Sequence, residues 1–188
     1  TDTKNLKLKF NNNVVGEIPI EALASKAPVY NRQWIQKKPN KNKVNIKDLK
    51  KVKIEDALIK ILSSPNHSNK SWVTNQYDQG VMCDTAQKSG SDAAIIRIHN
   101  KDKAIAVSVD SSANYCKSFP ILGGKQIVCE NWRNLITVGA RPLAITNCLN
   151  FGNPENKEIM GEFAECLDGI KEACEYLNYP VVSGNVSF

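Results

Sequence analysis

The chain has 188 residues, of which 41 % are hydrophobic and 23 % charged, which is enough for one ordinary globular domain and a short extension. No apolar run reaches the roughly 18–20 residues of a membrane span, and residues 1–10 lack the apolar block of a signal peptide. The composition therefore predicts a cytoplasmic protein without a membrane partner.

The net charge of +6 is concentrated in a lysine-rich stretch between Arg32 and Lys70. No aromatic residue follows Trp34 in that stretch, so nothing there could stack on a base. We interpret the stretch as a solvated linker and expect no nucleic-acid partner. RNA binding through these lysines is the alternative, and it would weaken steeply with salt.

The six cysteines form no Cys-x-x-Cys pair, and no secretion signal precedes them, so reduced and mostly buried thiols are expected. His67 and His99 have no partner at the spacing of a zinc site, and neither stands in a nucleophile–base arrangement. Both histidines are predicted to be structural or exposed, and no catalytic residue is expected in this chain.

The first third of the chain predicts only small elements. Residues 14–19 indicate a short strand, and residues 20–24 a short helix after it. Residues 31–53 are polar and lysine-rich, which is typical of a connector. Residues 54–62 have apolar side chains at helical spacing and predict an amphipathic helix.

From Trp72 onward the pattern predicts a compact unit of strands and helices. The expected elements are, in order, strands at 93–98 and 104–109, a helix opening at 123–126, a strand at 142–147, a helix at 155–177 and a strand at 180–183. This order predicts an α+β fold, a mixed sheet with helices on one face.

Polar side chains follow two of these strands, in residues 147–154 and 183–187. Loops at the carboxyl ends of strands often bind ligands, although Asn and Gly also form ordinary turns. Gly123 and Gly124 before a helix could face a phosphate or could simply form the helix entry. Asp110 could hold a cation or a ribose hydroxyl, or be a solvated loop carboxylate.

A series of short strings between Ser64 and Ser187 matches a known family in order. The strings are Ser64–Asn66, Trp72–Val73, Gln76–Asp78, Gly123–Gln126, Arg133–Leu135, Val138–Ala140, Pro142–Thr146, Cys148–Pro154 and Val181–Ser187. They resemble the phosphoribosylformylglycinamidine synthase family, also called formylglycinamide ribonucleotide amidotransferase.

The resemblance implies the fold of the N-terminal lobe of aminoimidazole ribonucleotide synthetase. Members of the family have two related halves, and the matching strings belong to the N-terminal lobe of the second half. We therefore expect residues 1–32 to be the tail of a preceding lobe, residues 33–63 a lysine-rich linker with a short helix, and residues 64–188 the lobe itself, with the C-terminal lobe missing.

The resemblance also implies a reaction: ATP-dependent conversion of formylglycinamide ribonucleotide to the amidine in de novo purine biosynthesis, with ammonia from glutamine. The implied partners are a glutaminase and a small accessory subunit, and the chain alone would be inactive. Position by position, Asn147 and Gly184 would bind ATP, Asn185 would ligate Mg²⁺ and Ser187 would contact the ribonucleotide.

Two positions depart from the family's pattern. Asn147 stands where the family usually has Asp, and Ser112–Asn114 stands where it tends to have Asn-Pro-Arg. Loss of a carboxylate and of a cationic side chain leaves an alternative, a structural or auxiliary nucleotide-binding module without catalysis. An exposed lobe-packing surface would also favour a homo-oligomer.

Overall fold

The computed structural model describes residues 3–36, 38, 45–77, 80–88 and 90–188. By their internal contacts these residues divide into two compact units, Thr1–Gln33 and Trp34–Phe188. No helix in the described part of the chain is both long and apolar enough to cross a membrane. The predicted division at residues 32 and 63 stays a prediction.

The first unit is a β-hairpin followed by one turn of helix. Strands β1 (Asn5–Phe10) and β2 (Asn13–Pro19) pair antiparallel, and helix α1 (Ile20–Leu23) follows directly. Strand β2 and α1 confirm the expected elements, whereas β1 was missed. Asn11 and Asn12 both have positive φ, the conformation that a tight hairpin turn requires.

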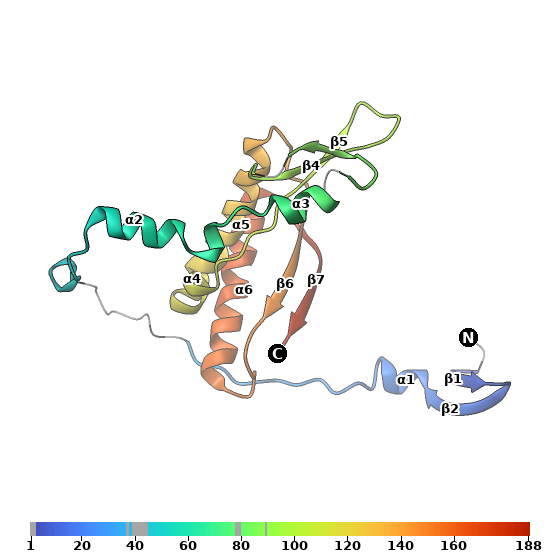
Figure 1. Cartoon of the computed structure of the whole chain (residues 1–188). Helices are drawn as coiled ribbons and strands as arrows, with labels where there is room; N and C mark the ends of the chain where they lie inside the picture. Colours follow the sequence, from blue (N-terminus) through green and yellow to red (C-terminus); the bar gives the residue numbers. More distant parts are fainter. Residues whose placement is uncertain (1–2, 37, 39–44, 78–79, 89) are drawn as a thin grey trace. The chain divides into compact units, whose positions relative to one another are not determined.

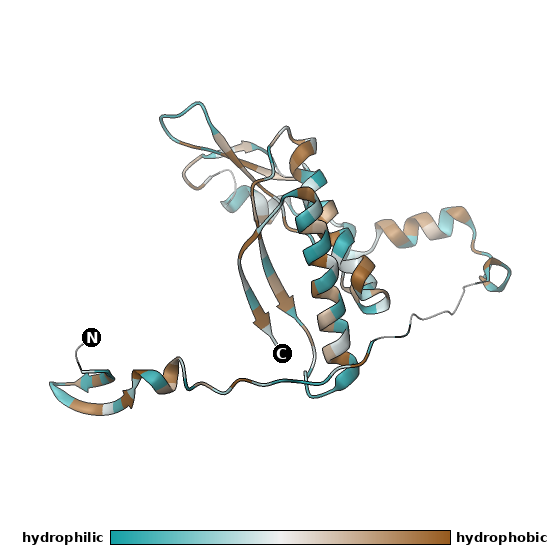
Figure 2. Cartoon of the chain, turned by 180° about the vertical axis from the view of Figure 1, so that it is seen from behind, coloured by the Kyte–Doolittle hydropathy of each residue, from teal (hydrophilic) through white to brown (hydrophobic). Residues whose placement is uncertain are grey.

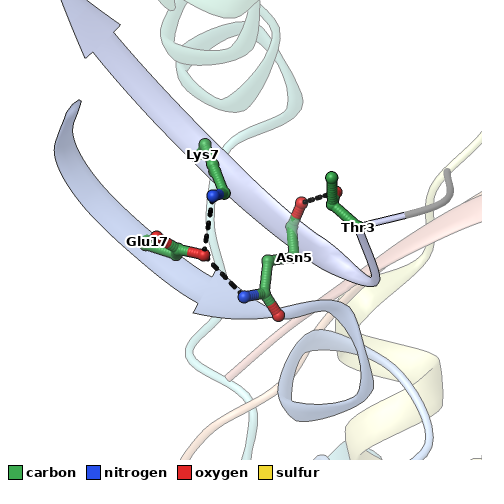
Figure 3. A network of polar contacts seen from close by, with 4 residues as sticks. All are labelled: Thr3, Asn5, Lys7 and Glu17. Atoms are coloured by element: carbon green, nitrogen blue, oxygen red, sulfur yellow. Dashed lines mark hydrogen bonds and ion pairs between the residues drawn. The ribbon is translucent and has the colours of Figure 1, made fainter. Parts of the chain in front are cut away.

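One polar network ties the two strands of the hairpin together (Figure 3). The Glu17 carboxylate accepts a hydrogen bond from Asn5 Nδ2 at 2.6 Å and pairs with Lys7 Nζ at 3.2 Å. The bond from Asn5, and then the contact with Lys7, hold the pKa of Glu17 below its usual value. The Thr3 hydroxyl donates to the Asn5 carbonyl at 3.3 Å.

Short helices occupy the next described segment, residues 45–77. They are the 3₁₀ turns η1 (Ile46–Asp48) and η2 (Pro65–His67) and the helices α2 (Ile54–Leu62) and α3 (Ser71–Tyr77). Helix α2 confirms the predicted helix at 54–62. The connector predicted at 31–53 lies partly outside the described residues.

An antiparallel sheet of three strands follows, in the order β3 (Thr85–Gln87), β4 (Ala94–Arg97) and β5 (Ala104–Val107). Strands β4 and β5 confirm the predicted hairpin, with Ala94 opposite Val107. Strand β3 was not expected from the sequence, because three residues give too short a pattern to recognise.

Two long helices, α5 (Pro120–Thr137) and α6 (Lys157–Leu177), form the packed centre of the second unit. The short helix α4 (Ala113–Ser118) lies beside them. Asn156 caps α6 by accepting from two backbone N–H groups, and Asn178 ends it in the left-handed conformation. The two helices lie side by side in Figures 1 and 2.

Glycines let these two helices approach closely. A Cβ at Gly124 would collide with the Cys166 carbonyl, and a Cβ at Gly169 with the Ile121 carbonyl. Helix α5 begins at Pro120, so Gly123 and Gly124 lie buried inside it. The glycine pair is therefore neither a phosphate-binding loop nor a helix-entry turn; it is a packing surface.

Strands β6 (Ile145–Asn150) and β7 (Val181–Ser187) pair in parallel beside α6 (Figure 1). The predicted α+β class is confirmed, but within the described residues the strands form separate small sheets rather than one mixed sheet. The predicted loops at 147–154 and 183–187 are largely strand, since ladder hydrogen bonds between them outweigh the turn preference of Asn and Gly.

Candidate functional site

The pairing of β6 with β7 brings together the four residues that the family resemblance predicts to bind ligands. Asn147 lies opposite Gly184, Cys148 opposite Asn185, and Asn150 opposite Ser187. These residues come from two strings far apart in the sequence, and the parallel register alone makes them neighbours.

The predicted residues nevertheless divide between the two faces of the strand pair. Side chains alternate along a strand, and paired residues share a face. Ile145 and Leu149 pack against the helical core. Asn147 lies between them on the same face of β6, and Gly184 is paired with it, so both face α6. Asn185 and Ser187 face the other way, where the Asn185 amide Nδ2 donates to Ser187 Oγ at 2.9 Å.

Asn147 and Gly184 are in direct contact. A Cβ at Gly184 would overlap the side-chain amide of Asn147, so only glycine leaves room for that amide. The contact sets the amide against the backbone of β7. An aspartate at 147 would have nearly the same size but would bring a negative charge to this place.

A cavity of about 540 Å³ opens beside Asn147, between the second half of α6 and the start of β7. Its wall is mostly apolar, and Asp168, Lys171 and Glu175 supply charged groups along α6. Cavities of several hundred cubic ångströms with a few polar groups are typical of small-molecule sites. The side of the strands that carries Asn147 can therefore accommodate a planar, largely apolar group such as a base.

The opposite face of the strands is exposed and polar. Asn150 Nδ2 donates to Cys148 Sγ at 3.4 Å, next to the Asn185–Ser187 bond. Mg²⁺ takes six oxygen ligands and usually at least one carboxylate. Asn185 and Ser187 offer one amide oxygen and one hydroxyl, and the residues paired with them carry no carboxylate. These strands alone therefore do not form a complete Mg²⁺ site.

Asp110 is neither a free ligand nor a solvated carboxylate, which corrects both interpretations of it. It accepts hydrogen bonds from Ser108 Oγ at 2.7 Å and from the side-chain amides of Asn131 and Asn134, both at 2.8 Å. The Tyr179 hydroxyl in turn donates to Asn131 Oδ1 at 2.7 Å. Burial raises the pKa of Tyr179, so this hydroxyl stays protonated at neutral pH.

Sequence reasoning missed Asn131 and Tyr179. A polar residue on the buried face of α5 was the available signal, because a buried amide needs partners elsewhere in the fold. The partners lie far away in the sequence, so only the fold reveals them.

Neither histidine lies on the paired strands. His99 Nε2 lies 2.6 Å from Asp84, which also pairs with Arg97 Nε at 3.2 Å, and His67 lies in η2. The bond from His99, with Arg97 contributing less, holds the pKa of Asp84 below its usual value.

Of the six free cysteines only Cys166 and Cys174 are buried, so the expectation of mostly buried thiols is wrong, and Cys148, opposite Asn185, is exposed. Burial raises the pKa of Cys166 to about 12, which keeps this thiol protonated and unreactive.

The fold and site define an α+β lobe in which a helical layer covers one face of a parallel strand pair and a cavity opens between them. Residues 90–188 match the family model described as AIR synthase related protein, N-terminal domain. The chain belongs to this family.

Curated relatives match the chain over its whole length. A phosphoribosylformylglycinamidine synthase subunit PurL from Pelagibacter ubique is 55 % identical over 189 residues, and one from Novosphingobium aromaticivorans is 47 % identical over 191 residues. The chain covers 26 % and 27 % of the length of these two relatives.

Solved structures agree with these matches. The structure of PurLQS from Thermotoga maritima has a TM-score of 0.69 at 30 % identity, covering 98 % of this chain and 28 % of that one. The T. maritima PurL complexed with ATP has a TM-score of 0.66, also at 30 % identity and with the same shares covered.

Proposed function

We propose that this chain is part of an ATP-dependent amidotransferase that converts formylglycinamide ribonucleotide to formylglycinamidine ribonucleotide, with ammonia derived from glutamine. The proposal rests on the pairing of Asn147 with Gly184 beside a cavity. It is supported by the match of this chain, over its whole length, to a part of synthase subunits. The chain alone would be inactive, since it spans only 26 % of such a subunit.

In the proposed reaction the γ-phosphoryl group of ATP moves to the amide oxygen of the substrate, and ADP leaves. Ammonia then adds to the amide carbon, and phosphate departs with the former amide oxygen. Phosphorylation turns a poor leaving group into a good one. Within this chain, Asn147 and the Gly184 backbone would bind and orient the nucleotide, and Ser187 would contact the ribonucleotide.

Asn185 would contribute a single oxygen ligand to Mg²⁺, with the remaining ligands coming from phosphate oxygens and water. When bound, the cation would neutralise charge that develops on the phosphates. The family resemblance implies a glutaminase and a small accessory subunit as partners, and the similarity to the structure of PurLQS supports an assembly with further subunits. A role in purine biosynthesis also favours a cytoplasmic location.

The test uses the full-length protein expressed from its gene. Gly184→Ala places a methyl group where the Asn147 amide lies, so we expect the affinity for Mg·ATP and the rate of amidine formation to fall at least about tenfold. Gly80→Ala is the control, because its Cβ would meet other atoms only at ordinary contact distance. An unmodified protein that makes no amidine from formylglycinamide ribonucleotide, Mg·ATP and ammonia would refute the proposal.

A second candidate is an auxiliary nucleotide-binding module without catalysis. It is favoured by the neutral amide of Asn147, where related proteins usually have a carboxylate, and by the incomplete Mg²⁺ ligand set. Asn147→Asp tests it by isothermal titration with Mg·ATP. A large gain in affinity would indicate a decayed site, whereas unchanged affinity would indicate that position 147 does not contact the nucleotide.

A further inference from the structure

We propose that Tyr179 is a positioning residue for the nucleotide site: its hydroxyl bond to Asn131 fixes the segment that leads from α6 into β7 and so keeps Gly184 opposite Asn147. The part of this inference that concerns ATP rests on the proposed function. The part that concerns the strand does not, and the two can be measured separately.

The Asn131 side chain is held in one orientation. Its Nδ2 donates to Asp110 Oδ2 at 2.8 Å and to the Ser108 carbonyl at 3.1 Å, which uses both amide hydrogens. Its Oδ1 is then left to accept from the Tyr179 hydroxyl at 2.7 Å. Asn131 and Tyr179 are only 8 % and 2 % exposed, so water does not compete for this bond.

Tyr179 stands where the chain turns from helix to strand. Its backbone N–H donates to the Cys174 carbonyl at 2.9 Å, and the next residue, Pro180, accepts from the Ile145 N–H at 3.0 Å. That bond is the first between the two strands. A ring anchored at Tyr179 therefore fixes the start of β7 relative to both α6 and β6.

The strand register needs such an anchor. Ile145 pairs with Val181 but Thr146 pairs with Ser183, so the register shifts directly after the first pair. A slip by one residue would place a residue with a side chain opposite Asn147 and move Asn185 and Ser187 to the other face. In the observed register Gly184 leaves room for the Asn147 amide, which a Cβ at this position would overlap.

Aromatic rings hold the other end of the strand pair. Phe163 on α6 lies edge-to-face between Phe151 and Phe188, with 5.2 Å between ring centroids in each pair. The Phe rings hold the strand pair at the end of β7, after Ser187, whereas Tyr179 holds it at the beginning, before Val181. Tyr179 is thus the anchor nearest the register shift.

The experiment compares Tyr179→Phe with the parent in the full-length protein, measuring hydrogen–deuterium exchange of residues 181–187 and titration with Mg·ATP. The substitution removes only the hydroxyl, so loss of one buried hydrogen bond should speed exchange in β7 by about tenfold and weaken ATP binding by a similar factor. Tyr176→Phe is the matched control, because Tyr176 lies on α6 and is 90 % exposed; it should leave both measurements unchanged.

Val128→Ala separates positioning from general loss of stability. Val128 is a core residue 1 % exposed, and its truncation should lower the melting temperature without changing ATP affinity. If Tyr179→Phe leaves exchange in β7 unchanged, the hydroxyl does not hold the strand and the inference is wrong. If exchange rises but ATP affinity stays the same, the positioning role of Tyr179 is wrong. If the parent protein binds no ATP, the proposed function and the ATP part of the inference are refuted. The exchange measurement still tests whether Tyr179 holds the strand.

Discussion

Helices α6 and α2 are both amphipathic, yet α6 buries a continuous row of residues and α2 buries none. The difference lies in the backbone. Gly169 of α6 lies next to the Ile121 carbonyl of α5, and Gly124 of α5 lies next to the Cys166 carbonyl of α6. Helix α2 has no glycine, and its apolar residues, visible in Figure 2, stay exposed. An apolar face predicts a helix, whereas only the tertiary contacts show which helix belongs to the core.

The largest expected effect is at the helix crossing. Gly169→Val would drive a branched side chain into the Ile121 carbonyl, and we expect a loss of unfolding free energy of about 3 kcal/mol or more, or failure to fold. Urea denaturation of the chain measures it, with Gly80→Val as the matched control. A loss no larger than that of the control would show that close approach does not hold the two helices together.

Truncating one apolar residue on α6 and one on α2 compares how much each helix contributes to stability. Ile170 on α6 is 8 % exposed, so Ile170→Ala should cost about 2–4 kcal/mol of unfolding free energy. Leu58 on α2 is 54 % exposed, so Leu58→Ala should change stability by no more than about 0.5 kcal/mol. Equal losses in the same urea experiment would contradict the assignment of α6, and not α2, to the core.

The polar network inside the packed region should have the next largest effect. Asn131→Ala leaves the Tyr179 hydroxyl without its acceptor and removes a donor to Asp110, which should cost about 1–3 kcal/mol. A double-mutant cycle with Tyr179→Phe tests whether the loss of stability comes from the hydrogen bond between the two side chains. The double variant should be less destabilised than the sum of the single variants, and strict additivity would rule out a coupled network.

The smallest effect is expected at the surface of the β3–β4–β5 sheet. His99 and Arg97 lower the pKa of Asp84, so this carboxylate stabilises the fold above its unfolded pKa, and the contribution is lost as pH falls through the lower folded value. Melting temperatures of the parent and of Asp84→Asn should therefore differ slightly at pH 6 and converge in acid below pH 3 or so. A difference that grows towards low pH would have the wrong sign.

Local patterns predicted most of the long elements. The helical spacing at 54–62 and 155–177 and the apolar run at 93–98 each predicted an element close to its observed bounds. Strands β1 and β3, the two 3₁₀ turns and helices α3 and α4 were missed, since three to seven residues give little periodic signal.

The sequence named candidate site residues but did not predict how they are arranged, and their roles stay predictions. Asn147, Gly184, Asn185 and Ser187 were expected in loops, whereas they lie in paired strands and on two different faces. The pairing of strands that are distant in the sequence depends on tertiary contacts, and so do the hydrogen bonds that Asp110 accepts from Asn131 and Asn134. No local pattern could contain that information.

The most direct test of the account is a crystal structure of the full-length protein with Mg²⁺ and a non-hydrolysable ATP analogue. The account predicts nucleotide density within hydrogen-bonding distance of the Asn147 amide and against the backbone of Gly184. Clear density for the nucleotide elsewhere in the protein, with Asn147 and Gly184 uncontacted, would contradict it.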